Sequence, residues 1–402
     1  MSKYFIFITG DKYPAMDAGA TRTHSFVKIC AELGYEPIVI GMGEYTGNTY
    51  QTFEGIKYYS LRLKNKDILS RLIGRMLFPY FAKKLIFNFQ PRYVKGIMLS
   101  SLSNRYFLAF IKKISLKYRI PVIYDSVEWY SPSEFKNGKN NSYFKANDNL
   151  NNHLIMPPLK VVAISRYLEN HFVEKGVSVV RIPVILDVEN ITHTVKSVDA
   201  SVIKIVYAGS PGNKDRLYEL IAAVSQLSSE EQKRLHIRII GIDKDTFIKK
   251  WWSNEIFSIS QSIYFEGRQS REYVLKSLNN ADFAFLLRPS EERYAKAGFP
   301  TKVAESLSCG TAMLCNYSSD LEMYLHDDEN SIIISGCNIK DCLISLRKIL
   351  NLSPDKIQDM KNCARITAEK NFNWKNHTET FNKLLTGGYE DEAASAFKNS
   401  LF

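Results

Sequence analysis

Residues 283–315 read FAFLLRPSEERYAKAGFPTKVAESLSCGTAMLC. The apolar run Phe283–Leu287 predicts a buried strand, and the run Ala312–Cys315 predicts a second one. Between them, Pro300 opens a predicted helix that ends just before Gly310, since proline favours the first helical turn and glycine the position after the last. A strand, a helix and a further strand in this order are typical of a parallel sheet covered by helices.

The same alternation of apolar runs and helical patterns extends through the whole chain. Most strand candidates are continuously apolar, as expected for strands that are buried on both faces of a sheet. The strand candidates are residues 4–10, 37–41, 56–61, 96–99, 122–125, 161–165, 203–209, 236–241, 263–267, 283–287, 312–315 and 331–334. The helix candidates are 21–33, 68–85, 105–118, 166–175, 215–227, 270–278, 301–309, 339–350, 354–370 and 374–385. Two consecutive series of this kind predict an α/β protein with two doubly wound, Rossmann-like sheets.

The order of these elements predicts two domains in the 402 residues. The polar stretch 187–201 lacks periodicity and is the predicted linker. The expected parts are an N-terminal domain over 1–190, a C-terminal domain over 200–372, a helix over 373–385 that crosses back to the first domain, and a tail over 386–402. Ligands of doubly wound sheets bind outside the carboxyl ends of the strands, so we expect the two domains to face each other across a cleft.

Composition narrows the class of protein. With 45% hydrophobic and 24% charged residues, the chain is typical of soluble globular proteins. It shows no secretory signal and no apolar stretch long enough to span a membrane, so we expect a cytoplasmic protein. The six cysteines lack metal-ligand or redox spacing, and the histidines are scattered. We therefore expect reduced thiols and no metal.

Positive charge is concentrated in one part of the first half. The segment from Ser60 to Arg119 holds fourteen Lys or Arg and a single acid, Asp67, in a chain of net charge +11. Within it, residues 68–87 combine basic and aromatic residues in a helical pattern, which resembles a segment that lies on a membrane surface. A core helix with a solvated basic face is the alternative. No nucleic-acid-binding motif accompanies the charge, so nucleic acid is not an expected partner.

The helix that starts at Pro300 is a candidate anion site. The N–H groups of Thr301, Lys302 and Val303 are expected to point out of the helix start, where a diphosphate is favoured. Lys302 adds a positive charge, and Glu305, one turn further on, can accept hydrogen bonds from two ribose hydroxyls. An ordinary strand–helix junction is the alternative interpretation.

Short motifs at a consistent spacing resemble a known family. They are Gly19–Arg22 after the first strand, Tyr124–Glu128 at a strand end, Ala163–Leu168, Arg181–Pro183, Tyr207–Ser210 with Lys214, Phe299–Lys302 with Glu305 and Gly310, and Phe372–Trp374. Their order over about residues 5–385 resembles the retaining glycosyltransferases of family four, which have the two-domain GT-B fold.

The resemblance implies a transferase that moves a sugar from a UDP- or GDP-linked donor to a glycan or lipid-diphosphate-linked acceptor. It implies retention of configuration, a role in surface-polysaccharide synthesis, and no metal or other cofactor. The basic segment from Ser60 to Arg119 indicates an acceptor at the inner face of the plasma membrane. Lys214 and Glu305 would be the catalytic residues. The implied donor-binding residues are Gly19, Gly209, Ser210, Lys214, Arg268, Pro300, Thr301, Lys302, Val303 and Glu305. The candidate acceptor-binding residues are Arg22, His24, Asp125 and Glu128.

Two positions depart from the family pattern. Ala297, the last residue of a predicted polar loop over 288–297, stands where the family has a first glutamate that contacts the transferred sugar. Val127 stands where a histidine is frequent. Because of these departures the sugar stays open. A sugar-nucleotide epimerase or hydrolase of the same fold, and a non-catalytic nucleotide-sugar-binding protein, are the alternative functions.

Overall fold

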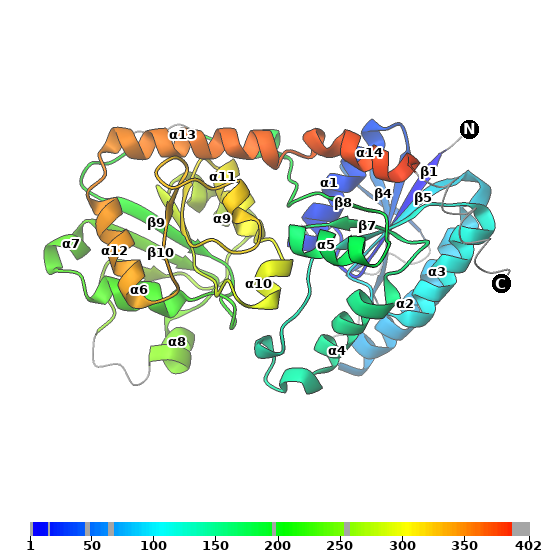
Figure 1. The fold of residues 1–402 in the computed structure, drawn as a ribbon, viewed down its shortest axis with the longest axis horizontal. Helices are drawn as coiled ribbons and strands as arrows, with labels where there is room; N and C mark the ends of the chain where they lie inside the picture. The colour runs from blue at the N-terminus through cyan, green and yellow to red at the C-terminus, as the bar shows by residue number, and fades with distance from the viewer. Residues whose placement is uncertain are drawn as a thin grey trace. The chain divides into compact units, whose positions relative to one another are not determined.

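The structure is a computed structural model that describes residues 3–14, 17–44, 49–62, 68–194, 198–252 and 258–387. The side chains of residues 44, 62 and 68–76 lie outside that description. The chain forms two compact units, each a mixed α/β structure (Figure 1). The first unit comprises residues 1–130, 139–185 and the chain from Trp374 on, and the second comprises residues 131–138 and 186–373.

The first unit is built on a sheet whose described strands have the order β3-β4-β2-β1-β5-β6-β7-β8. All neighbouring strands are parallel except β3, which is antiparallel to β4. The strands are β1 (Tyr4–Thr9), β2 (Glu36–Glu44), β3 (Gln51–Phe53), β4 (Ile56–Arg62), β5 (Val94–Ser100), β6 (Val122–Ser126), β7 (Lys160–Ala163) and β8 (Val179–Arg181). The helices are α1 (Ala18–Glu32), α2 (Ile68–Asn88), α3 (Arg105–Tyr118), α4 (Ser142–Asn149), α5 (Arg166–Glu174) and α14 (Thr378–Thr386). Among the described residues, no helix is long and apolar enough to cross a bilayer.

The sheet of the second unit is parallel throughout its described strands, in the order β11-β10-β9-β12-β13-β14. Its strands are β9 (Ile203–Ala208), β10 (Leu235–Ile240), β11 (Ile263–Phe265), β12 (Phe283–Leu286), β13 (Ala312–Cys315) and β14 (Ser331–Ile333). Its helices are α6 (Leu217–Ser225), α7 (Ser229–Lys233), α8 (Lys244–Phe247), α9 (Arg271–Asn279), α10 (Arg293–Ala297), α11 (Thr301–Ser308), α12 (Ile339–Leu350) and α13 (Pro354–Asn371). Apolar residues of the strands and of α6, α12 and α13 form one buried core.

The predicted fold class is confirmed, because both units are sheets of the doubly wound α/β kind. The elements that the sequence analysis missed are short or polar. They are β3, β8, α4, α7, α8 and α10. The polar loop predicted over 288–297 is wrong in its second part, where residues 293–297 form α10. Five residues are too few for a helical hydrophobic period to be recognised.

The chain crosses from the first unit to the second before the predicted linker 187–201. It also makes two crossings that were not predicted, on either side of the segment 131–138. The crossing before the linker lies at Ile185 and Leu186, and both side chains are buried. The segment 131–138 also belongs to the second unit. It is held there because the Ser131 hydroxyl accepts a hydrogen bond from the N–H of Tyr294, at 3.2 Å. No local pattern in the sequence predicts a contact between residues that are 163 positions apart.

The last described helix completes the core of the first unit. Phe381 of α14 is fully buried, and its ring lies 5.4 Å from that of Phe26 and 6.1 Å from that of Phe5, centroid to centroid. The buried Lys160 donates hydrogen bonds to the carbonyls of Leu384 and Gly387. The C-terminal segment is therefore an integral part of the first unit.

Phe381→Ala is expected to destabilise the first unit by about 3–5 kcal/mol, because truncating a fully buried aromatic ring loses its transfer free energy and leaves a cavity. Urea unfolding followed by fluorescence and circular dichroism measures the change. Ile366→Ala is the control, since that α13 side chain is 60% exposed. An equal effect of the two substitutions would contradict the role assigned to α14.

Candidate active site

Three glycines follow adjacent parallel strands in the second unit. Gly209, Gly241 and Gly267 come after β9, β10 and β11, with φ angles of 139°, 117° and 61°. The N–H of Gly209 donates to the carbonyl of Ile240 at 2.8 Å, and that of Gly241 donates to the carbonyl of Gly267 at 2.6 Å. A Cβ atom on Gly241 would lie 2.3 Å from the carbonyl oxygen of Gly209. Only glycine permits both this backbone conformation and this close approach.

Beside these turns, a buried carboxylate ties together four segments of the chain. Asp215, which precedes α6, accepts hydrogen bonds from Lys302 Nζ at 2.5 Å, from Arg288 Nε at 2.7 Å and from the Tyr207 hydroxyl at 2.8 Å. Lys302 Nζ also lies 4.3 Å from the ring centroid of Tyr207. A Cβ atom on Gly209 would lie 3.1 Å from this Nζ. The arrangement places two cations at the carboxyl end of the sheet.

The charges of this cluster support one another. Burial by itself raises the pKa of the Asp215 carboxyl, but the Lys302 and Arg288 cations outweigh burial and hold that pKa well below its usual range. Burial lowers the pKa of the Lys302 ammonium, and the Asp215 carboxylate opposes this change. With two cations and one carboxylate, the cluster has a net positive charge and can attract an anion.

Glu305 lies in α11 and is paired with a residue that the sequence analysis did not name. Arg271, the first residue of α9, directs Nη2 and Nε to Glu305 Oε1 at 3.2 Å and 3.3 Å. Burial raises the pKa of Glu305, and the Arg271 guanidinium opposes that rise. The side chain is 18% exposed, so Arg271 fixes the carboxylate while part of it still faces solvent.

The start of α11 differs in one detail from the prediction. Pro300 is the residue before the helix rather than part of its first turn, and it is buried together with Val303. The N–H of Val303, however, donates to the carbonyl of Pro300 at 3.0 Å. The expectation that this N–H is free for an anion is therefore wrong, because the first turn closes on itself. The predicted anion-binding role then falls to the N–H groups of Thr301 and Lys302.

The remaining donor candidates of the second unit lie near the glycine turns. Ser210 and Arg268 are exposed and directly follow Gly209 and Gly267. Lys214 Nζ lies 2.8 Å from Glu134 Oε1 and 5.4 Å from the ring centroid of Tyr294. Tyr294 belongs to α10 and Glu134 to the segment 131–138, so two elements missed in the sequence analysis position this lysine.

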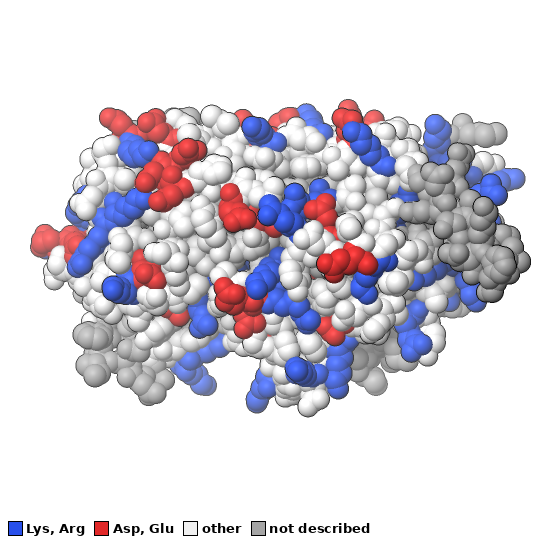
Figure 2. Space-filling model, in the orientation of Figure 1, with Lys and Arg blue, Asp and Glu red and all other residues white. Residues whose placement is uncertain are grey.

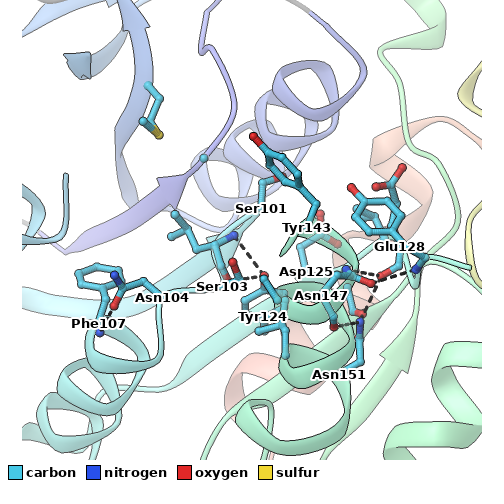
Figure 3. Close-up of a pocket in the computed structure, with 18 of the residues that line it drawn as sticks. Ser101, Ser103, Asn104, Phe107, Tyr124, Asp125, Glu128, Tyr143, Asn147 and Asn151 are labelled. Atoms are coloured by element: carbon cyan, nitrogen blue, oxygen red, sulfur yellow. Dashed lines mark hydrogen bonds between the residues drawn. The ribbon is translucent and has the colours of Figure 1, made fainter. Parts of the chain in front are cut away.

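The first unit has its own cavity at the carboxyl ends of β5 and β6, with a volume of about 540 Å³ (Figure 3). Residues of the segments after these strands line it on one side, and residues of α2, α3 and α4 line the others. Its polar lining consists of Ser101, Ser103, Asn104, Tyr124, Asp125, Ser126, Glu128, Tyr130, Tyr143, Asn147 and Asn151.

The acceptor candidates separate into buried and exposed groups. Arg22 is buried, and its Nε and Nη2 each approach the Asp125 carboxylate to 2.9 Å. The guanidinium also donates to the carbonyl of Ile182 at 3.1 Å. His24 is buried too, with Nδ1 at 2.8 Å from the Tyr13 hydroxyl. Of the four candidates, Asp125 and Glu128 line the cavity, and Glu128 is exposed.

Gly19 lies inside α1 rather than in a loop before the helix, which corrects the prediction. A Cβ atom on Gly19 would come within 2.5 Å of the Asp11 carboxyl carbon. Asp11 accepts hydrogen bonds from the hydroxyls of Thr9 at 2.9 Å and Ser101 at 3.0 Å. The glycine therefore leaves room for this carboxylate against the start of the helix.

Asp215→Asn is expected to cost about 3–5 kcal/mol of stability at pH 7, because it leaves two cations without their carboxylate. The pKa of Asp215 is lowered in the folded state, so its charge stabilises the fold fully above the ordinary value of about 3.9 and progressively less as the pH falls below it. Urea unfolding of the two proteins at pH 7 and pH 3 should therefore show a smaller difference at pH 3. Asp359→Asn, at an exposed position of α13, is the control, and a pH-independent difference would contradict the assignment.

A family model matches the part of the chain that holds this site. Residues 191–367 match the model of the family described as glycosyl transferases group 1. No curated protein matches the chain. Sucrose-phosphate synthase from Thermosynechococcus elongatus is similar in structure, with a TM-score of 0.72, 12% identity, and coverage of 95% of this chain and 98% of that one.

Two further solved structures are similar over the same extent. The Anabaena protein HepE in complex with UDP-glucose has a TM-score of 0.65, 13% identity, and coverage of 96% of this chain and 100% of that one. The lipopolysaccharide glycosyltransferase WaaG has a TM-score of 0.65, 12% identity and the same coverage. At these identities the likeness shows the fold alone, which is that of GT-B enzymes. Residues 191–367 thus match a glycosyl transferases group 1 domain, and the chain has the GT-B fold of these structural neighbours.

Proposed function

We propose that the second unit binds a UDP- or GDP-linked sugar and that the chain transfers this sugar to a glycan or lipid-linked acceptor. The observation that carries the proposal is the cluster in which buried Asp215 holds Lys302 and Arg288 at the carboxyl end of a parallel sheet. It lies within the residues that match the transferase family. The similar structure of HepE is a complex with UDP-glucose, which supports a donor of this kind.

The diphosphate of the donor fits the charges of this site. Lys302 and Arg288 are held in place before the donor arrives, so little reorganisation is needed when negative charge develops on the leaving phosphate. Lys214, the residue before Asp215 in the sequence, adds a third cation. The N–H groups at the start of α11 and the backbone of the glycine turns allow a close approach of phosphate oxygens.

The nucleoside half of the donor is assigned to Glu305. Its carboxylate can accept hydrogen bonds from the two ribose hydroxyls, and Arg271 holds it in a fixed orientation. The sugar lacks the glutamate that contacts it in the family pattern, because that position is Ala297, which is fully buried in α10. Other groups must therefore select the sugar.

Retention of configuration is part of the proposal and is supported by the resemblance to family-four enzymes. In that mechanism the leaving phosphate oxygen takes the acceptor proton on the same face, and the protein supplies orientation and charge stabilisation. The anomeric configuration of the new glycosidic bond, measured by ¹H NMR and compared with that of the sugar in the donor, tests this part by itself.

We also propose that the first unit binds an anionic membrane surface, at the cytoplasmic face, through α2 and α3. The two helices lie side by side, since the Phe87 and Phe110 rings are 6.1 Å apart and Lys83 Nζ lies 4.4 Å from the Phe110 ring centroid. Figure 2 shows blue side chains over these helices at the lower right. We call this surface the basic face and define it by Tyr80, Lys83, Lys84, Phe87, Arg105, Tyr106, Lys113, Leu116 and Lys117.

The basic face combines the two features of an interfacial surface. Tyr106 is 75% exposed, Tyr80 62%, Leu116 60% and Phe87 48%, which is unusual for large apolar side chains. The sequence from 68 to 119 contains no acid, so nothing in it repels anionic headgroups. Exposed rings that insert at the headgroup level and lysines that attract the lipid charge act together in such a segment.

Lys302→Met is expected to lower donor-dependent product formation about 100-fold or more, because it removes a fixed cation from the leaving diphosphate. Glu305→Gln should weaken stabilisation of the protein by UDP or GDP, measured as the shift in thermal unfolding temperature. Lys276→Met and Glu272→Gln are the matched controls, since both residues are exposed on α9. Unchanged kinetics in Lys302→Met and an unchanged nucleotide shift in Glu305→Gln would remove the site assignment.

The triple variant Lys84→Glu, Lys113→Glu and Lys117→Glu is expected to lose binding to liposomes that contain phosphatidylglycerol. The expected loss is about 100-fold or more, because each lysine near an anionic surface contributes about 1 kcal/mol. Co-sedimentation at low and high salt measures it.

A charge-matched variant of the second unit controls for net charge. Lys244→Glu, Lys249→Glu and Lys276→Glu change three exposed lysines and alter the net charge by the same amount. This variant should bind the liposomes like the native protein. Equal losses in the two triple variants, or no binding by the native protein, would contradict the proposed membrane face.

A further inference from the structure

The cavity of the first unit and the basic face are built on the same turns of α2 and α3. Phe78 and Pro79 line the cavity, whereas the next residue, Tyr80, belongs to the basic face. Asn104 and Phe107 also line the cavity, and the residues between them, Arg105 and Tyr106, are exposed. A molecule bound in the cavity is therefore close to a molecule bound on the basic face.

The two surfaces differ sharply in charge. None of the described residues that line the cavity is Lys or Arg, although the helices beside it carry Lys83, Lys84, Arg105 and Lys113. These lysines and arginines thus lie outside the cavity, and its described lining contains no cationic side chain.

The cavity has the chemistry of a site for neutral hydroxyl-rich groups. Hydroxyls of Ser101, Ser103 and Tyr143 and amides of Asn104 and Asn147 lie around it (Figure 3). Some of their hydrogen bonds are made within the protein, because Ser101 donates to Asp11 and Asn104 accepts from the N–H of Phe107. The Ser101 oxygen can still accept and the Asn104 amide N–H groups can still donate, as partners of sugar hydroxyls do. Its volume of about 540 Å³ is within the range of about 300–1,000 Å³ typical of small-ligand sites.

Of the two carboxylates that line the cavity, Glu128 disfavours an anionic ligand. The negative charge of Asp125 is balanced by Arg22, whose guanidinium binds the carboxylate through two hydrogen bonds. This pair therefore adds no net charge. Glu128 is exposed at the cavity and would repel a second carboxylate or a phosphate. Burying such an anion without a cationic partner is costly.

We propose that the cavity receives an uncharged terminal sugar of a lipid-linked acceptor, while the phosphate groups of that lipid stay on the basic face. The inference rests on the proposed function and adds the chemical class of the acceptor. It excludes acceptors that end in a uronic acid or a phosphorylated sugar.

The test uses the full chain and three kinds of phosphatidylcholine liposome. They contain polyprenyl diphosphate alone, polyprenyl diphosphate linked to a neutral hexose, or the same lipid linked to a hexuronic acid. The neutral-sugar liposomes should bind about tenfold more tightly than either of the others. Equal binding of all three, or tighter binding of the hexuronic acid, would overturn the proposal.

Variants of the cavity and of a control position sharpen the test. Glu128→Lys should weaken binding of the neutral-sugar lipid and strengthen binding of the hexuronic acid lipid, which reverses the preference. Glu174→Lys makes the same change at an exposed position of α5 in the first unit and should leave the preference unchanged. The same shift in both variants, or in neither, would contradict a selective cavity.

A separate measurement distinguishes this inference from the proposed function. Stabilisation of the native protein by UDP or GDP in thermal unfolding reports on the second unit alone and involves no acceptor. If the nucleotides stabilise the protein and the three liposomes bind equally, the acceptor class is wrong and the donor proposal stands. If the sugar preference is found without nucleotide stabilisation, the donor proposal fails instead.

Discussion

The hydrogen-bonded ion cluster around Asp215 is the interaction on which the proposed donor site depends. A carboxylate that is almost fully buried is stable only with charged partners, and here Lys302 and Arg288 supply them. The same contacts fix the start of α11, the end of β12 and the loop before α6 relative to β9. Because the cations are already fixed by their own counter-ion, the site can present positive charge without having to order flexible side chains.

The first unit also contains a buried carboxylate with a charged partner, but there the charges balance. Asp125 is a buried carboxylate near the end of β6, and its partner Arg22 lies in α1. One carboxylate and one guanidinium cancel, so the cavity beside them carries no excess positive charge. Both units thus hold a buried carboxylate, but its cationic partners outnumber it in the second unit and balance it in the first.

Much of the fold could be predicted because it follows from local patterns. Continuously apolar runs gave the buried strands, and Pro300 and Gly310 gave the limits of α11. Within the candidate site, the place of Lys302 and Glu305 near a helix start was also predictable, since it is a local feature. Their partners Asp215 and Arg271 were not, because Asp215 is 87 positions from Lys302 and Arg271 is 34 positions from Glu305. The short charged run Lys214–Arg216 after the glycine turn was the one available signal.

The sequence by itself determined the fold class, the family resemblance and the concentration of basic residues in one segment, because each depends on residue types at fixed spacing. The tertiary structure decided which charges meet. It buried Arg22 against Asp125, bound Lys302 to Asp215, closed the first turn of α11 on Val303 and placed Gly19 inside α1 against Asp11. These outcomes depend on distances between residues far apart in the chain, and only packing of the sheets and helices fixes such distances.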